Sequence, residues 1–246
     1  MIEQTVEIAT KDGKTTTFIV HPERNAPHPV ILFFMDAPAI REELRDMARR
    51  IATAGYYVML PNLYYRKGVL ELADLPPLPE AEARARMFEL MGSINIGMVM
   101  DDADGLLDFA GRDPAASPGP AGAIGYCMSG QYAINVAARH PERIACAASL
   151  YGVQLVTDRP DSPHLAAHRS KAELYFACAE HDTYAPLEMV EALDASLKDS
   201  AANAEVEIYP GVHHGFAFPG RKGIYDKPAA ERHWERLFAL FQRNLG

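Results

Sequence analysis

Hydrophobic and polar positions along the chain follow two alternating patterns, which predict strands and helices in turn. Residues 4–10 and 15–21 have strand-like composition, and Asp12-Gly13 between them is typical of a hairpin turn. The apolar run over residues 30–35 is continuous, as expected for a strand buried on both faces. Further short apolar runs predict strands at residues 56–60, 121–125, 144–150, 173–178 and 205–209.

Helical periodicity fills the stretches between these strands. It covers residues 40–54 and ends at Gly55, a residue type that commonly follows a helix C-terminus. A long, mostly helical stretch is predicted over residues 80–111, and further helices over residues 130–139, 187–199 and 227–244. Residues 68–79, rich in Pro and Leu, are expected to leave the core. Strands that alternate with helices predict an α/β fold, with a mostly parallel sheet and helices on both faces. Because no repeat or clear boundary interrupts the pattern, we expect one domain spanning residues 1–246.

Composition and charge exclude several classes of partner. The chain has 246 residues, 48% of them hydrophobic, and 33 acidic against 24 basic side chains give a net charge of −9. Nucleic acids and anionic membranes both select clustered positive charge, so we expect neither as a partner. The apolar runs are far shorter than the ~20 residues that span a bilayer. A monomer or small homo-oligomer is expected.

The N-terminal sequence and the cysteines indicate a cytoplasmic protein. Met1-Ile2-Glu3-Gln4 has neither the basic nor the apolar region of a secretory signal. The three cysteines are an odd number without a C-x-x-C pair, which argues against a disulfide framework or a structural zinc site and suits a reducing compartment. We expect no metal and no organic cofactor.

One segment carries the clearest chemical signal. Residues 121–130 read as an apolar strand, then Gly125-x-Cys127-x-Ser129, then a helix. This pattern is typical of a nucleophile elbow, with cysteine as the nucleophile and small residues on either side of a tight turn. The start of the following helix would favour a thiolate. The alternative, a small buried hydrophobe, is the usual role of cysteine and the one we expect for Cys146 and Cys178, which lie inside apolar strands.

An elbow needs an acid and a histidine, in that order, later in the chain. Asp182 follows the predicted strand over residues 173–178, although a single Asp in a loop is often only a turn or cap residue. His213 and His214 follow the next strand, and their adjacency leaves the base ambiguous by one position. The agreement of three separate segments strengthens the hypothesis of a catalytic triad.

Several motifs resemble the dienelactone hydrolase (carboxymethylenebutenolidase) family of the α/β-hydrolase fold. They lie between about residues 29 and 216 and include the stretch that follows residue 56. The most specific is the cysteine elbow, because most α/β-hydrolases use serine. The motifs are Gly125-Tyr126-Cys127-Met128-Ser129-Gly130, Glu180-His181-Asp182 with Pro186, and Tyr209-Pro210-Gly211-Val212-His213-His214-Gly215-Phe216.

The resemblance implies specific roles for residues of this chain. It makes Cys127, Asp182 and His214 the triad, since the family's histidine stands two residues before a phenylalanine, here Phe216. The backbone N–H groups of Met128 and Ala37 would form the oxyanion hole, one just after the nucleophile and one on the loop after an earlier strand.

The same resemblance implies three further positions, and two of them depart from the family pattern. Asp36 stands where the family has a glutamate that contacts the resting thiol, and its side chain is one methylene shorter. Arg84 corresponds to one of two arginines that hold the substrate carboxylate. The other falls at Phe218, so the anion clamp has lost one arm unless nearby Arg221 replaces it. Arg84 is equally well explained as a solvated helix charge.

The expected function is therefore hydrolysis of a small ester or lactone through a thioester at Cys127. Two alternatives remain open. The same triad could cleave an amide or a thioester, or the fold could be a non-catalytic scaffold used for binding. The fold alone does not identify the substrate.

Overall fold

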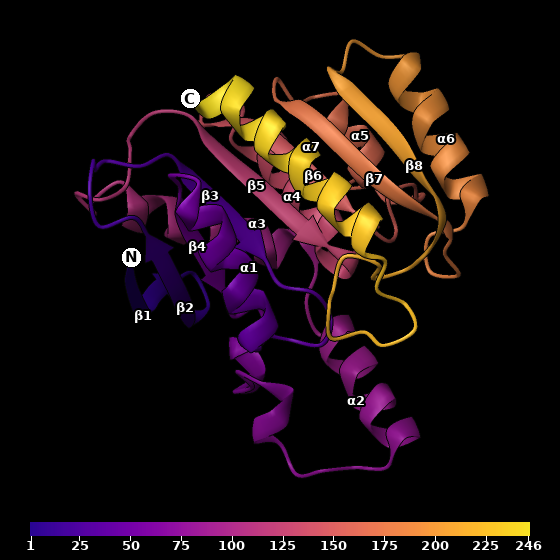
Figure 1. The fold of residues 1–246 in the computed structure, drawn as a ribbon, viewed down its shortest axis with the longest axis horizontal. Helices are drawn as coiled ribbons and strands as arrows, with labels where there is room; N and C mark the ends of the chain where they lie inside the picture. The colour runs from indigo at the N-terminus through magenta and orange to yellow at the C-terminus, as the bar shows by residue number, and fades with distance from the viewer. The chain divides into compact units, whose positions relative to one another are not determined.

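The computed structural model describes all 246 residues, and these divide into two compact units, Met1–Pro118 and Gly119–Gly246. Each unit has its own strands and helices (Figure 1). The single domain expected from the sequence stays a prediction. No helix in either unit combines the length and apolar character needed to cross a bilayer.

The first unit contains four strands in the order β1-β2-β4-β3. The predicted hairpin is confirmed, because β1 (Ile2–Thr10) pairs antiparallel with β2 (Gly13–His21). The pair β3 (Val30–Phe34) and β4 (Tyr57–Pro61) is parallel, and both strands are buried along their whole length. This burial explains why their sequences are continuously apolar instead of alternating.

Two helices of the first unit fill one predicted stretch. The sequence predicts a mostly helical stretch over residues 80–111, and the structure has α2 (Glu80–Gly92) and α3 (Ile96–Ala110) there. The break between them lies at Asn95, whose extended backbone and side-chain oxygen, which accepts from the Met98 N–H at 3.0 Å, cap the start of α3. The prediction of a mostly helical stretch is therefore confirmed, and a single capping residue starts its second helix.

These helices differ in how they pack within their unit. Helix α1 (Glu42–Thr53) buries an apolar face on β2 and β4, and α3 packs on β1. Helix α2 buries only Leu90, and Figure 1 shows it extending away from the strands of its own unit. The preceding Pro- and Leu-rich stretch, residues 68–79, is buried only at Val69, as expected of a segment that leaves the core, and contains a short 3₁₀ turn at Leu72–Asp74.

The second unit is a parallel α/β arrangement. Its strands β5 (Ala121–Tyr126), β6 (Ile144–Leu150), β7 (Glu173–His181) and β8 (Ala204–His213) lie in sequence order, and all their pairings are parallel. The helices are α4 (Gly130–Arg139), α5 (Pro163–Ala167), α6 (Leu187–Lys198) and α7 (Lys227–Leu245). Helix α5 was not expected from the sequence, since five residues are too few to show a periodicity.

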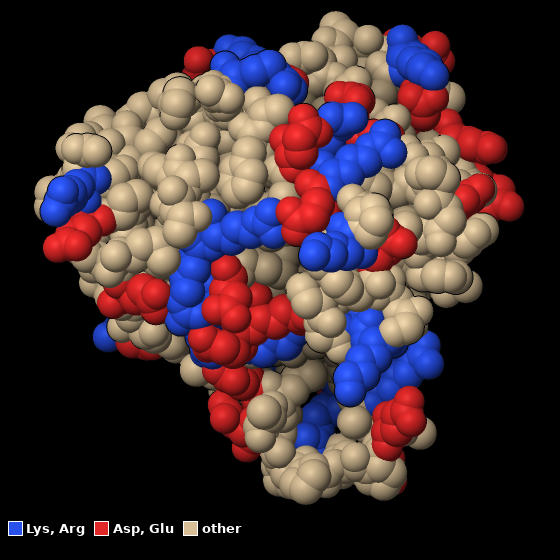
Figure 2. All heavy atoms as spheres, in the orientation of Figure 1, with Lys and Arg blue, Asp and Glu red and all other residues tan.

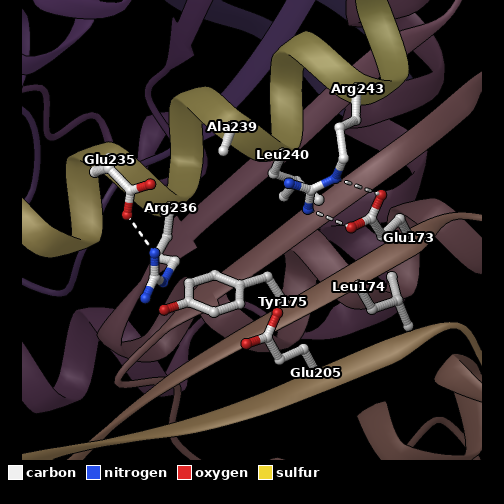
Figure 3. Close-up of a pocket in the computed structure, with 9 residues that line it drawn as sticks. All are labelled: Glu173, Leu174, Tyr175, Glu205, Glu235, Arg236, Ala239, Leu240 and Arg243. Carbon is white, nitrogen blue, oxygen red and sulfur yellow. Dashed lines mark hydrogen bonds and ion pairs between the residues drawn. The ribbon is translucent and has the colours of Figure 1, made fainter.

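Helix α7 is held on the strands of its unit by an apolar face and by ion pairs. The α7 residues Trp234, Leu237 and Phe241 are buried, and Figure 1 shows the helix crossing β5, β6 and β7. A groove of about 250 Å³ lies where the C-terminal half of α7 meets β7 and β8 (Figure 3). There Arg243 pairs with Glu173 at 2.5 Å. Because exposed ion pairs contribute at most about 1 kcal/mol, the apolar face supplies most of the stabilisation.

Charged side chains are largely matched with partners of opposite sign. Figure 2 shows Lys and Arg lying beside Asp and Glu on the face drawn. One pair in the first unit is buried: Arg66 donates to both oxygens of Asp102, at 2.9 and 2.8 Å, and also contacts Asp12. The pair therefore ties the β1–β2 hairpin to α3.

The packing of α3 on β1 generates a stability prediction. A Cβ atom at Gly105 would lie 2.5 Å from the backbone oxygen of Ala9, closer than real contacts allow. We expect Gly105→Ala to lower the free energy of unfolding by about 1–3 kcal/mol, as overpacking does, although alanine favours helix. Chemical denaturation measures this. Gly92→Ala is the matched control, because a Cβ there meets nothing within 4 Å; equal stability of the two variants would contradict the prediction.

Candidate active site

The site in the second unit is built on the turn between β5 and α4. Cys127 has a φ of +55°, in the left-handed region that non-glycine residues rarely adopt. A Cβ atom at Gly125 would lie 2.0 Å from the backbone oxygen of Ser129, so only glycine fits there. This close approach forces the sharp turn that a nucleophile elbow requires.

The end of β6 and the loop after it pack against the turn between β5 and α4. A Cβ at Gly130 would lie 2.3 Å from the Ser149 Oγ, and a Cβ at Gly152 would lie 2.1 Å from the same atom. The backbone N–H of Val153 donates to the carbonyl of Cys127 at 3.2 Å. The unusual φ of Cys127 is therefore maintained by packing that surrounds the turn on several sides.

Asp182 and His214 meet at the ends of β7 and β8. The parallel register of these strands shifts near their ends and pairs His181 with His213, so the following residues are brought together. The Nδ1 atom of His214 donates to Asp182 Oδ2 at 2.7 Å. The other oxygen of Asp182 accepts from the backbone N–H groups of Tyr184 and Ala185, at 2.8 and 3.0 Å. Both oxygens of the carboxylate are thereby oriented.

The surroundings of His214 favour its protonated form. Burial lowers the pKa of the imidazole, but the hydrogen bond to Asp182 and the interaction with Cys127 outweigh burial and raise this pKa to about 9. The Nε2 atom is buried and has no hydrogen-bond partner, although the Cys127 side chain is near enough to affect the pKa. A thiol beside such an imidazole can transfer its proton to form a thiolate–imidazolium pair.

The structure distinguishes the two adjacent histidines. His214 is buried and bonded to Asp182, whereas His213 is exposed and its ring centre lies 5.3 Å from that of His181. The ambiguity of one position in the sequence therefore resolves to His214 as the imidazole that faces the carboxylate.

Two tyrosines that no sequence pattern singled out lie beside His214. The ring centres of Tyr151 and Tyr184 each lie 5.0 Å from that of His214, with interplanar angles of 66° and 62°. Tyr151 directly follows β6, and Tyr184 stands two residues after Asp182. Their positions at the carboxyl ends of strands were the available signal, because ligands bind at that edge of α/β sheets.

Phe218 and Arg221 lie in the loop that follows His214. Phe218 is fully buried and packs on Tyr126 and Tyr151. The Arg221 guanidinium lies 5.5 Å from the Phe218 ring centre, and its Nη1 donates to the His214 carbonyl at 3.4 Å. Arg221 thus stands beside the position of the missing arginine, and the substrate-binding role of this position stays a prediction.

Glycine at position 215 makes room for this arginine. Its φ is +91°, and an added Cβ would lie 2.4 Å from the Arg221 Nη1. The guanidinium therefore packs directly over the backbone that follows His214.

Three of the expected site residues belong to the first unit. Both oxygens of the fully buried Asp36 accept from Arg41, at 2.6 and 3.1 Å. Ala37 follows it, and its carbonyl accepts from the Tyr64 hydroxyl at 3.0 Å. The proposed contact of Asp36 with the thiol and the oxyanion role of Ala37 stay predictions.

The third of these residues, Arg84, is exposed on α2. Its guanidinium lies 5.6 Å from the ring centre of Phe88. Its neighbour Arg86 donates to the carbonyl of Pro76 at 3.2 Å. The carboxylate-binding role expected for Arg84 stays a prediction.

The other cysteines lack the features of a nucleophile. Cys146 and Cys178 are buried in β6 and β7, and burial raises the pKa of each thiol to about 12. Cys127 is partly exposed at the turn. A thiol-directed reagent should therefore find one accessible target.

Comparison with known proteins matches nearly the whole chain. The model of the dienelactone hydrolase family matches residues 15–245. A Salmonella typhi protein assigned as a carboxymethylenebutenolidase is 29% identical over 226 residues, which cover 89% of this chain and 78% of that protein.

Solved structures show the same fold. A Klebsiella pneumoniae protein assigned as a dienelactone hydrolase is similar with a TM-score of 0.86 and 24% identity, covering 98% of each chain. The dienelactone hydrolase-like promiscuous phosphotriesterase P91, from metagenomic libraries, has a TM-score of 0.77 and 18% identity, covering 100% of each chain. The chain therefore has the α/β-hydrolase fold that the sequence predicts.

The raised pKa of His214 predicts how stability depends on pH. Because the folded pKa of about 9 exceeds the ordinary value of 6.5, the stabilisation is complete below pH 6.5 and is lost as pH rises to about 9. We expect a loss of about 3 kcal/mol over this window, and a smaller loss in Asp182→Asn. Urea unfolding at several pH values measures both.

Glu180→Gln is the matched control for this prediction. It removes a neighbouring carboxylate that accepts from the Gly211 N–H and is not bonded to His214. We expect it to keep the wild-type pH dependence. The interpretation would be wrong if Asp182→Asn and wild type lost stability equally over the window.

Proposed function

The chain belongs to the dienelactone hydrolase family, and from this premise we propose that it hydrolyses a small lactone or carboxylic ester through Cys127, His214 and Asp182. The observation that carries the proposal is the 2.7 Å bond from His214 Nδ1 to Asp182, which leaves a buried Nε2 to interact with Cys127. In this arrangement the Asp182 carboxylate keeps a proton on Nδ1 of His214, and Nε2 can accept the proton of the Cys127 thiol.

The first half of the reaction forms a thioester. The Cys127 proton passes to His214 Nε2, and the thiolate attacks the carbonyl carbon of the substrate. The carbonyl oxygen gains negative charge. We propose that the backbone N–H groups of Met128 and Ala37 donate hydrogen bonds that stabilise this charge. The carbon–oxygen bond to the leaving group then breaks, and the departing oxygen takes the proton from His214.

The second half releases the acid. His214 accepts a proton from water, and the resulting hydroxide attacks the thioester carbonyl. The carbon–sulfur bond breaks as the tetrahedral intermediate collapses, and the sulfur leaves as thiolate beside the imidazolium. One water is consumed, and return of the imidazolium proton to the sulfur restores the thiol and the neutral imidazole with which the reaction began. Asp182 keeps the imidazole oriented through both halves without giving up its own charge.

The nucleophile is tested by comparing wild type with Cys127→Ala on a dienelactone, a neutral lactone, an aryl ester and a thioester. We expect wild type to turn over at least one of these, and the variant to lose at least about 10³-fold in kcat. Absorbance spectroscopy follows each reaction. Cys146→Ala, in the buried strand β6, is the matched control and should retain activity.

Each result of this comparison has a definite meaning. Equal hydrolysis by wild type and Cys127→Ala would exclude Cys127 as the nucleophile. Faster turnover of the thioester than of the oxygen esters would favour the alternative scissile bond. A non-catalytic scaffold would show no turnover and no rapid alkylation of Cys127 near neutral pH.

We further propose that Arg84 and Arg221 recognise a substrate carboxylate. The support for Arg221 is its position over Phe218 and its contact with the His214 carbonyl. The proposal predicts that Arg221→Gln raises KM for a carboxylated lactone about tenfold and leaves KM for the neutral lactone nearly unchanged. Arg84→Gln should act in the same direction.

Steady-state kinetics on this pair of lactones measures the discrimination. Arg232→Gln is the control, because Arg232 pairs with Glu207 at the start of α7. If Arg221→Gln raised KM equally for the carboxylated and the neutral lactone, the arginine would support the structure of the loop and would not recognise the anion.

A further inference from the structure

The imidazole of His214 is contacted by two tyrosine rings that come from different loops. Tyr151 follows β6, and Tyr184 follows β7. Each ring centre lies 5.0 Å from that of the imidazole, and the interplanar angles of 66° and 62° define edge-on contacts. Neither ring occupies the hydrogen-bond direction of Nδ1, which Asp182 already fills.

We propose that Tyr151 and Tyr184 form an aromatic clamp that stabilises the protonated imidazole of His214 and holds its orientation between the sulfur and the carboxylate. Both tyrosines are positioning residues, because they act through His214. The proposal deepens the proposed function by adding a device that keeps the thiolate–imidazolium pair assembled.

The physical basis is the charge distribution of an aromatic ring. The face of a tyrosine ring is negative and its edge is positive, so the ring attracts a cation that lies over its face within about 6 Å of its centre. Both centre-to-centre distances are inside this limit, and we take the imidazole as the ring whose edge points at each tyrosine face. A neutral imidazole gains less from the same contacts than an imidazolium does, so the two rings favour the protonated state.

Backbone geometry supports a specific role for Tyr151. Its φ is +37°, which is unfavourable for a bulky side chain, and the residue is completely buried. Its N–H donates to the carbonyl of Ala177 at 2.6 Å, and the following Gly152 packs closely on Ser149. Strain of this kind persists where the surrounding structure holds it, and it clusters at functional sites. Here the strained residue is one whose ring contacts His214.

Other groups also act on the charge of His214. Burial opposes the imidazolium, whereas Asp182 and Cys127 favour it. The Arg221 guanidinium, which carries a like charge, contacts the backbone carbonyl of His214. The adjacent His213 is exposed, where solvent screens its effect. The tyrosine rings add stabilisation without a further net charge and without competing for Nε2, which must remain free to exchange protons.

Tyr184 provides the test, because its side chain is 44% exposed and can be changed without opening the core. The experiment compares wild type with Tyr184→Phe, Tyr184→Trp and Tyr184→Leu. Phenylalanine and tryptophan keep a ring beside His214, and leucine removes it. The first readout is the pKa of the His214 imidazole by NMR titration, with the signal assigned by its absence in His214→Gln. The second is the rate of Cys127 alkylation by iodoacetamide at pH 7.

We expect Tyr184→Leu to lower the pKa of His214 by about half a unit and to slow alkylation about two- to fivefold. Tyr184→Phe should match wild type, and Tyr184→Trp should equal or exceed it. Tyr151→Phe, which also keeps a ring, should match wild type in both readouts. A role confined to structure would instead lower thermal stability without separating the ring-bearing variants from leucine.

Two outcomes would overturn the clamp. In one, Tyr184→Leu titrates like wild type. In the other, Tyr184→Phe behaves like leucine, so that the hydroxyl and not the ring is responsible. Neither readout requires a substrate, so a failure of the proposed hydrolysis is separable. If no ester is hydrolysed while the titration shifts as expected, the clamp stands and the function fails.

Discussion

The close approach of two backbone segments at the end of β5 is the constraint on which the site depends. With glycine at position 125, the carbonyl of Ser129 can lie where a side chain would otherwise be, and the chain turns sharply enough to give Cys127 its positive φ. The turn presents the sulfur at the carboxyl end of the strands, at the start of a helix where free N–H groups favour negative charge. Any larger residue at position 125 would push the helix away.

The same unit brings Asp182 and His214 together by a different device. The ends of β7 and β8 are parallel neighbours, and an irregularity in their register carries Asp182 and His214 to within hydrogen-bond distance. Burial alone would keep the imidazole neutral. The carboxylate and the sulfur reverse this preference, and the result is a histidine that holds its proton well above neutral pH. The charge of His214 is therefore coupled to both of its neighbours, Asp182 and Cys127.

Particular elements show where sequence patterns succeed and where they stop. Helix α4 and strand β6 have the predicted limits, because each has a single pattern flanked by clear breaks. The mostly helical stretch predicted over residues 80–111 is confirmed, but the pattern did not locate the break between α2 and α3, which depends on the single cap at Asn95. Helix α5 is too short to produce a periodic signal. A hydrophobic periodicity is read over several residues, so it does not reveal a cap that a single residue makes.

The sequence by itself determined the alternation of strands and helices, the cysteine turn, and the order in which Cys127, Asp182 and His214 follow successive strands. These features depend on residues that are close together in the chain, where spacing and residue size are decisive. The family resemblance selected His214 over His213, and only the tertiary structure showed its contact with Asp182 and placed Tyr151 and Tyr184 around that imidazole. These contacts join residues 30 to 63 positions apart, and their distances depend on strand register and loop packing, which no local pattern encodes.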